Sequence, residues 1–240
     1  VLMNGVDYVC HEAAISSVPG SIADPLTANE VNVTGTLNVL MAAREAKVKR
    51  VIFASSSAVY GDAPTLPKIE TMRPMPMSPY AASKLAGETC MQVFYHSYGL
   101  ETVSLRYFNV FGPRQDPHSQ YAAVIPRFIT ALLNDDKPTI YGDGTQSRDF
   151  VYVQNVVQAN LLAMRAEQTR GEAVNISCGK ATSINTLLST LCELCGKDVQ
   201  AAYAERRQGD VAYSLVDCKA ATELLGYVPT ISFWDGIRLT

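Results

Sequence analysis

Short apolar runs and longer stretches with helical periodicity alternate along the first half of the chain. Strands are expected at about 6–11, 50–55 and 101–106, and helices at about 25–46 and 80–98. The run at 50–55 is rich in strand-forming residues and is followed by a polar segment, which is typical of a buried strand that ends at a loop. This alternation predicts parallel βαβ units, with ligands bound outside the carboxyl ends of the strands.

The pattern becomes less regular from about residue 112 onward. Helices are expected there at about 123–134, 153–166, 184–195 and 218–225. We interpret this part as a smaller lobe that is interleaved with one more strand and helix of the sheet domain. The sheet domain is then assigned to residues 1–111 and 149–179, and the lobe to residues 112–148 and 180–240.

Composition and charge indicate an ordinary folded enzyme. Of the 240 residues, 48% are hydrophobic and 18% are charged, which is normal globular usage. A net charge of −3 without a basic cluster gives no electrostatic footprint for nucleic acid, and no apolar stretch approaches the roughly 20 residues of a membrane span. We therefore expect a cytoplasmic enzyme whose partner is a small molecule, not nucleic acid or a membrane.

The cysteines are dispersed, which disfavours a disulfide framework or a metal site. They are Cys10, Cys90, Cys178, Cys192, Cys195 and Cys218. Cys192 and Cys195 have the spacing of a redox motif, but they fall in an amphipathic helical pattern in which positions i and i+3 share a core face. Buried free thiols are expected, and with only His11, His96 and His118 available no metal is expected.

Tyr80 and Lys84 are the strongest chemical signal. They lie at positions i and i+4 of a predicted helix that follows Pro79, so the phenol and the ammonium share one helical face. The serine run at 55–57 follows a predicted strand. A Tyr, a Lys and a hydroxyl can together relay a proton beside a nicotinamide, whereas an exposed helix pair is the alternative interpretation.

Several separate segments carry a resemblance to a known family. They are 11–14, 17–19, 32–36, the serine run, the Tyr80/Lys84 pair, 106–112, 142–144, 147–150 and 209–211. On these segments the chain resembles the extended short-chain dehydrogenase/reductase family and, within it, the nucleotide-sugar 4-epimerases. The resemblance covers nearly all of the chain. It implies a Rossmann-like, doubly wound parallel sheet with a smaller α/β substrate-binding lobe.

The glycine turn of a dinucleotide fold is not found in this sequence. The segment Gly142-Asp143-Gly144 is its only G-x-G, and a loop-to-strand setting does not offer a helix N-terminus for a pyrophosphate. If the resemblance holds, roughly 80 residues with the first strands of the sheet lie in front of Val1. We therefore expect the chain to be an excerpt of a longer protein that lacks the first strands of the sheet.

The resemblance assigns the catalytic roles. Tyr80 would be the base, Lys84 would lower the pKa of Tyr80 and bind the nicotinamide ribose, and Ser56 would hydrogen-bond the reacting oxygen. Ser55 or Ser57 could take the role of Ser56. Dehydratases of this family place Asp-Glu after the active hydroxyl, and decarboxylases place Glu there, whereas this chain has Ser57 and Ala58. The reaction implied is NAD-dependent 4-epimerisation through a 4-keto sugar.

The resemblance also assigns the binding residues. Those expected at the NAD cofactor are Ala13, Ala14, Asn32, Ser55, Tyr80, Lys84, Tyr107, Asn109 and Val110. Those expected at the UDP-sugar are Ser17, Ser56, Ser57, Asn109, Ala123, Val124, Tyr141, Arg148, Arg207, Asp210 and Ser214. Arg148 and Arg207 would supply bidentate charge to the pyrophosphate, or they could be surface charges.

Ser214 bears on the choice of sugar. In the relatives a large aromatic residue at this position excludes N-acetyl groups and a small residue admits them, so Ser214 favours UDP-N-acetylglucosamine and UDP-N-acetylgalactosamine. A UDP-glucose or UDP-glucuronate 4-epimerase and a cofactor-less nucleotide-sugar-binding remnant are the alternatives. By the family's habit, the helices at 25–46 and 80–98 would form a homodimer interface, although 80–98 could instead bury its second face within the monomer.

Overall fold

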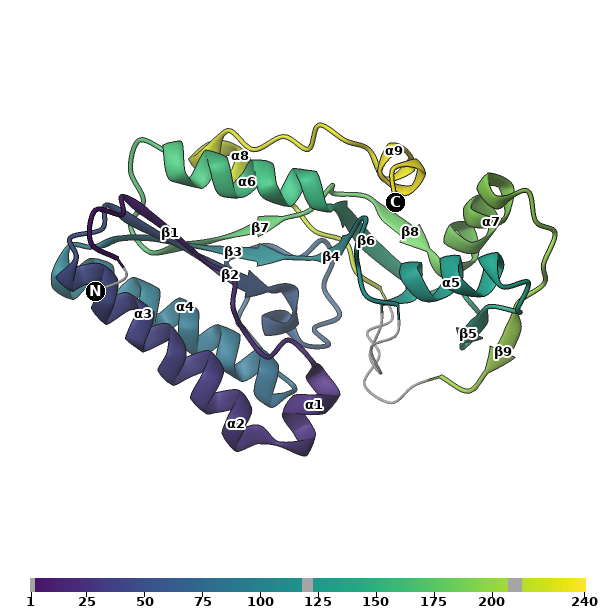
Figure 1. Cartoon of the computed structure of the whole chain (residues 1–240), viewed down its shortest axis with the longest axis horizontal. Coiled ribbons are helices and arrows are strands. Elements are labelled where there is room, and N and C mark those ends of the chain that lie inside the picture. Colours follow the sequence, from purple (N-terminus) through teal and green to yellow (C-terminus); the bar gives the residue numbers. More distant parts are fainter. Residues whose placement is uncertain (1–2, 118–122, 207–212) are drawn as a thin grey trace.

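The chain is built around a parallel sheet of four strands. The computed structural model describes residues 3–117, 123–206 and 213–240. The strands are β1 (Tyr8–His11), β2 (Arg50–Ser56), β3 (Glu101–Tyr107) and β7 (Glu172–Ile176), hydrogen-bonded in the order β1-β2-β3-β7 (Figure 1). All three pairings are parallel. The three strands expected in the first half of the chain are confirmed, and β1 begins two residues later than expected.

Helices cover both faces of this sheet. On one face lie α4 (Pro79–Tyr98) and a continuous helical stretch made of α2 (Pro25–Asn29), the π-helical turn η1 (Glu30–Thr34) and α3 (Gly35–Glu45). On the other face lie α6 (Val153–Arg165) and α8 (Lys219–Leu225) (Figure 1). The α/β fold with a doubly covered parallel sheet is therefore confirmed.

Local sequence signals explain the bounds of α4. The Ser78 hydroxyl accepts from the Ala81 N–H as the N-cap, and Pro79 occupies the first turn. At the other end Gly99 has a φ of 67°, the left-handed conformation that glycine adopts at low energy after a helix. These signals place Tyr80 in the first turn, next to the carboxyl ends of the strands.

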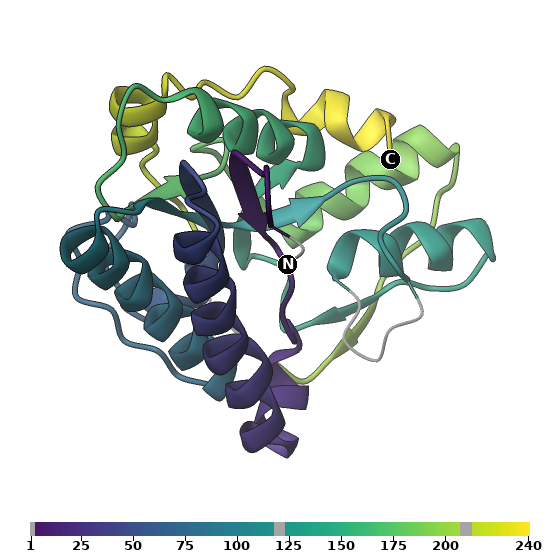
Figure 2. The same cartoon turned by 60° about the vertical axis from the view of Figure 1, so that its left-hand side comes forward.

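A second, smaller region lies beyond the main sheet. It contains a sheet of β4 (Asn109–Phe111), β6 (Ser147–Tyr152) and β8 (Ala181–Ser183), and the pair β5 (Thr139–Tyr141) and β9 (Ala202–Ala204). The helices α5 (Val124–Leu133), α7 (Ile184–Cys195) and α9 (Phe233–Arg238) accompany these strands (Figure 2). The expected domain boundaries at 111/112 and 148/149 run through the three-stranded sheet, because β4 and most of β6 lie on one side of them and β8 lies on the other.

Separate hydrophobic clusters fill the two regions. Phe111, Phe150 and Phe233 form an aromatic centre in the smaller region, with ring centroids of Phe111 and Phe150 6.2 Å apart and those of Phe150 and Phe233 5.5 Å apart. In the main sheet, Ile52 and Leu105 pack toward α6 and α8. The aromatic cluster joins β4, β6 and α9, which explains why β6 belongs to the smaller region although it leads directly into α6.

A short helix before α2 was not expected from the sequence. The helix α1 (Val18–Ala23) begins after Ser17, whose hydroxyl accepts from the Gly20 N–H at 2.9 Å. The signal was present, since Ser17 followed by Pro19 is a favourable helix start, but one turn is too short for a periodic pattern. The fold thereby uses Ser17, an expected substrate residue, as a helix cap.

The six cysteines are free thiols. The expectation that they are buried is wrong for Cys10, which is exposed on β1 at the edge of the sheet, while the other five are half-buried. Within the described ranges no helix is long and apolar enough to cross a membrane.

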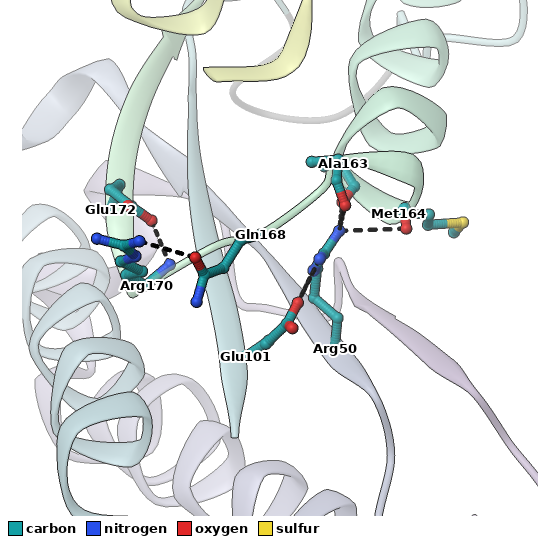
Figure 3. Close-up of polar contacts among 8 residues, drawn as sticks. Arg50, Glu101, Ala163, Met164, Gln168, Arg170 and Glu172 are labelled. Carbon is teal, nitrogen blue, oxygen red and sulfur yellow. Dashed lines mark hydrogen bonds and ion pairs between the residues drawn. The ribbon is translucent and has the colours of Figure 1, made fainter. Parts of the chain in front are cut away.

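A buried arginine ties β2 to the end of α6. Arg50 is 0% exposed, and its Nη1 donates to the carbonyls of Ala163 at 2.6 Å and Ala166 at 2.9 Å, while its guanidinium pairs with Glu101 of β3 (Figure 3). The last carbonyls of a helix have no partner within the helix and carry its negative dipole end, so a guanidinium satisfies them well. Arg50 thus fixes α6 on the sheet at the end remote from the serine run.

Candidate active site

The serine run lies at the carboxyl end of β2. Ser55 and Ser56 are the last residues of the strand, and Ser57 begins the short 3₁₀ helix η2 (Ser57–Tyr60). The Ser56 hydroxyl accepts from the Ala58 N–H at 3.1 Å and caps this turn. The serines are therefore held at the edge of the sheet where a parallel α/β fold binds its ligands.

The Ser56 hydroxyl lies beside the Tyr80 side chain, close enough to affect the pKa of the phenol. Burial raises the pKa of Tyr80 above its usual value, and Ser56 opposes this by lowering it. The Tyr80 backbone N–H donates to the Ser21 hydroxyl at 3.0 Å, which attaches α1 to the start of α4. The structure thus brings together two of the three residues expected to be catalytic.

Lys84 completes this group. It is 4% exposed, and its ammonium donates to the Ala54 carbonyl at 2.7 Å and lies 5.9 Å from the centre of the Tyr80 ring. Burial lowers the pKa of Lys84 to about 8, and the nearby Glu12 carboxylate partly opposes this shift by raising the pKa. Lys84 is therefore a buried cation beside the phenol, not one member of an exposed helix pair.

The three serines have different partners. The Ser55 side chain is buried and its hydroxyl donates to Glu88 Oε1 at 2.5 Å, so a cofactor contact by Ser55 would come from its backbone. Ser56 is the serine that reaches Tyr80. Among the alternatives left by the sequence, this geometry favours Ser56 over Ser55 as the hydroxyl beside the base.

Asn32 connects the loop after β1 to α4. It lies in the π-helical turn η1, is 3% exposed, accepts from the Ile15 N–H at 2.8 Å and donates to the Ile15 carbonyl at 3.0 Å and the Ser83 hydroxyl at 2.9 Å. Ala13 and Ala14, expected at the cofactor, belong to the loop that Asn32 holds. Asn32 therefore acts in this structure by fixing the loop, within one residue of Lys84 along α4.

A carboxylate that sequence reasoning missed lies nearby. Glu12 Oε1 accepts from the Tyr107 hydroxyl at 2.9 Å, and Asn160 donates to that hydroxyl at 2.8 Å. Burial, followed by the negative charge of Glu12, raises the pKa of Tyr107, so Tyr107 is neutral at physiological pH. Glu12 directly follows His11 in one of the family segments, which was the available signal. Its charge faces Lys84 and partly offsets the effect of burial on that ammonium.

A cavity of about 260 Å³ opens in the smaller region. It is lined by five residues expected at the UDP-sugar, namely Asn109, Ala123, Val124, Tyr141 and Arg148. Val110, expected at the cofactor, also lines it. The sequence places these residues up to 39 positions apart, between 109 and 148, and the fold brings them to one hollow.

Two lining residues were missed by the sequence reasoning. The Arg127 guanidinium of α5 lies 5.5 Å from the centre of the Tyr141 ring, and Gln146 donates to the Tyr141 carbonyl at 2.6 Å. Asn109, the first residue of β4, donates to the Asp149 carbonyl at 3.1 Å. The cavity therefore combines apolar walls with two arginines and two amides, a set suited to an anionic ligand that has a flat base.

Ser214, another expected substrate residue, does not line this cavity. The Ser214 N–H donates to the Ser147 carbonyl at 3.1 Å, which places Ser214 at the start of β6, next to Arg148. Ser214 is half-buried. Arg207 and Asp210 lie outside the described residues.

Comparison with known proteins shows the family of the chain. Residues 1–177 match the NAD dependent epimerase/dehydratase family. The chain belongs to this family. A solved UDP-N-acetylglucosamine 4-epimerase from Methanobrevibacter ruminantium, in complex with UDP-N-acetylmuramic acid, is 43% identical with a TM-score of 0.96 over 100% of this chain and 76% of that one. A UDP-glucose 4-epimerase complex with NAD from Thermus thermophilus is 39% identical with a TM-score of 0.88, over 98% of this chain and 76% of that one.

A sequence relative supports the same placement in the NAD-dependent epimerase/dehydratase family. The putative UDP-glucose 4-epimerase of Methanocaldococcus jannaschii is 41% identical over 234 residues, which are 97% of this chain and 75% of the relative. The expected family and its NAD cofactor are confirmed, and the relatives are nucleotide-sugar 4-epimerases, in agreement with the expected enzyme class.

Proposed function

We propose that this protein interconverts the C4 epimers of a UDP-sugar, with UDP-N-acetylglucosamine and UDP-N-acetylgalactosamine as the substrates. The observation that carries the proposal is the contact of Tyr80 with Ser56, with the Lys84 ammonium 5.9 Å from the Tyr80 ring. The cavity lined by Asn109 supports binding of the nucleotide diphosphate part of the substrate, because Arg127 and Arg148 also line it.

The residues present fit the nicotinamide end of the family's cofactor. An ammonium has three N–H donors, and the Ala54 carbonyl uses one of those on Lys84, so two remain for ribose hydroxyls. The loop with Ala13 and Ala14 presents small side chains at the end of β1, where a flat ring can approach the backbone. NAD held there would supply a reversible hydride acceptor for C4 of the sugar.

The chain's own residues handle the proton. In the phenolate form, Tyr80 takes the proton of the C4 hydroxyl as the hydride leaves, and gives it back when the 4-keto sugar is reduced on its other face. Ser56 hydrogen-bonds the same oxygen and holds it beside the phenol. Lys84 stabilises the phenolate, because its ammonium lies 5.9 Å from the centre of the Tyr80 ring and a nearby cation favours the charged form of a phenol.

The residues after Ser56 favour epimerisation over dehydration. Ser57 and Ala58 form the start of η2 and carry no carboxyl group that could protonate and expel a sugar hydroxyl. The keto intermediate then has one productive fate at this site, which is reduction. Turning the sugar before reduction gives the opposite configuration at C4.

The preference for acetylated sugars rests on Ser214. Its side chain is small, and its backbone N–H donates to the carbonyl of Ser147, the residue before the cavity-lining Arg148. A serine leaves space for an N-acetyl group that a large ring would fill.

The test is a comparison of turnover with three substrates. Purified protein supplied with NAD is incubated with UDP-N-acetylglucosamine, UDP-glucose or UDP-glucuronate, and the products are separated by chromatography. We expect the highest kcat/KM with UDP-N-acetylglucosamine. Higher kcat/KM with UDP-glucuronate or UDP-glucose would reassign the substrate, and no turnover of any of the three would refute the enzymatic proposal.

We also propose that two copies of the chain associate through the helical face of α1 to α4. Exposed apolar side chains gather on these helices, among them Ile22 at 61%, Leu26 at 82% and Val93 at 47% exposed. Exposed apolar side chains on neighbouring helices are typical of an interface between copies. Light scattering after gel filtration tests it: wild type should be a dimer, Leu26→Asp a monomer, and Leu133→Asp, at a side chain of α5 that is 66% exposed, a dimer. A monomeric wild type would contradict the proposal.

A further inference from the structure

Glu88 is a buried carboxylate one turn beyond Lys84 on α4. It is 4% exposed and accepts three side-chain hydrogen bonds: Oε1 from Ser55 at 2.5 Å and from Arg106 Nε at 2.9 Å, and Oε2 from Arg106 Nη2 at 2.7 Å. A carboxylate removed from water is retained only with a paired charge and filled acceptor sites. Glu88 meets both conditions, and one of its three donors is the serine that precedes Ser56.

The network continues through Arg106 into the sheet. Arg106 Nη1 donates to the Tyr60 hydroxyl at 2.8 Å, and that hydroxyl donates to Asn175 Oδ1 at 2.7 Å. Tyr60 is the last residue of η2, which begins at Ser57, and Asn175 lies on β7. The segment 55–60 is thus held at both ends by Glu88, directly through Ser55 and indirectly through Arg106 and Tyr60.

Three successive residues of β2 contact one face of α4. The Ala54 carbonyl accepts from Lys84, the Ser55 hydroxyl donates to Glu88, and the Ser56 side chain lies beside Tyr80 and lowers its pKa. Tyr80, Lys84 and Glu88 are spaced four residues apart and lie on one helical face. Of these three contacts, the one made by Glu88 involves a buried ion pair and is the hardest to shift.

We infer that Glu88 is a positioning residue for the reaction: by holding Ser55 and Tyr60, it fixes the serine segment against α4 so that Ser56 stays within reach of Tyr80. The effect of Glu88 on catalysis rests on the proposed function. The placement of the serine segment by Glu88 is independent of the proposed function. A displacement of about 1 Å at a reacting group lowers rates by up to about 100-fold, so a loosened segment affects turnover more than it affects substrate binding.

The decisive variant is Ser55→Ala. It removes the link from Glu88 to the serine segment and leaves the Glu88–Arg106 ion pair in place. The matched control is Thr102→Ala, because Thr102 is also fully buried and its hydroxyl also ties the sheet to α4, at the Met91 carbonyl 2.7 Å away and away from the serines. Both variants lose one buried hydrogen bond between strand and helix.

The readouts separate positioning from stability. For Ser55→Ala we expect kcat to fall about 10-fold or more with KM within about two-fold of wild type, and hydrogen exchange to accelerate in the peptide that covers 56–61. For Thr102→Ala we expect a lower Tm, with kcat and exchange at 56–61 like those of wild type. Equal behaviour of the two variants in kcat and exchange would overturn the inference.

Glu88→Gln provides a second measurement. Made in wild type and in the Ser55→Ala background, it should lower kcat less in the second background, because the link to Ser55 is already lost there. Equal effects in both would show that Glu88 does not act through Ser55. If wild type turns over none of the three UDP-sugars, the proposed function fails, while accelerated exchange at 56–61 in Ser55→Ala alone still supports the placement of the segment by Glu88.

Discussion

Lys84 donates a hydrogen bond of 2.7 Å to the backbone carbonyl of Ala54, two residues before Ser56. The contact fixes the ammonium in a buried position, and burial lowers the pKa of Lys84 to about 8. Burying the Lys84 ammonium, whose charge the proposed chemistry needs, therefore lowers the stability of the folded protein by an amount that depends on pH.

The pH dependence of stability should reveal this cost. Between pH 8 and 10.5 the unfolded chain binds more protons at Lys84 than the folded chain does, so wild type gains stability relative to Lys84→Met as pH rises through this window, by about 3 kcal/mol in total. Below pH 8 both states are protonated and the difference is constant. Urea unfolding of both proteins at pH 7, 8, 9 and 10 measures it; a difference that stays flat above pH 8 would contradict the burial of the charge.

Removing the Tyr80 hydroxyl should abolish the base while keeping the fold. In Tyr80→Phe the ring remains packed near Lys84, and the lost proton transfer should lower kcat by about 10²- to 10⁴-fold. Tm should stay within about 2 °C of wild type, because the ring keeps its packing and the substitution removes only the contact of the hydroxyl with Ser56. Tyr203→Phe, at a side chain that is 64% exposed, is the control and should keep full turnover.

A large residue at position 214 should change the choice of sugar. We expect Ser214→Tyr to abolish turnover of acetylated sugars and to spare UDP-glucose, because the ring would occupy the space of the N-acetyl group. Steady-state kinetics with UDP-N-acetylglucosamine and UDP-glucose measure the two effects. Loss of both activities, or of neither, would defeat the proposed role of Ser214.

The cation over the Tyr141 ring should contribute to binding rather than to chemistry. Arg127→Met removes a guanidinium 5.5 Å from the ring centre in the cavity wall, and we expect KM for the UDP-sugar to rise about 5-fold with kcat unchanged. Isothermal titration with UDP should show the same loss of affinity. A fall in kcat at constant KM would place Arg127 at the reacting end instead.

The Arg50–Glu101 pair should be a strong stability determinant. Glu101→Gln leaves the fully buried Arg50 guanidinium without its carboxylate, and we expect a loss of roughly 3 kcal/mol in the free energy of unfolding. Glu223→Gln breaks an exposed pair with Lys219 at 3.6 Å and should cost less than about 0.5 kcal/mol. Chemical denaturation distinguishes the two, and similar losses would mean that Arg50 is adequately satisfied by the α6 carbonyls.

Local signals in the sequence determined the longer helices and the strands of the main sheet. Hydrophobic periodicity and Pro79 predicted α4 to within one residue, and Ser78 and Gly99 explain its two ends, because each of these signals acts over a single turn. The spacing of Tyr80 and Lys84 placed both on one face for the same reason. The family segments then indicated the chemistry, since their residue types follow from the reaction.

Only the tertiary structure decided the contacts that bind distant segments together. The strands β4, β5, β8 and β9 have three residues each, too few to show an alternating pattern, and their pairing decided that β6 joins the smaller region. In the sequence Glu88 looks like an ordinary helix-surface residue, and only the packing of β3 against α4 pairs it with Arg106. Likewise, Arg127 lies over the Tyr141 ring only because the fold places β5 next to α5. Propensity and periodicity act between near neighbours along the chain, whereas the charge pairing and cavity walls of this site depend on which elements pack against one another.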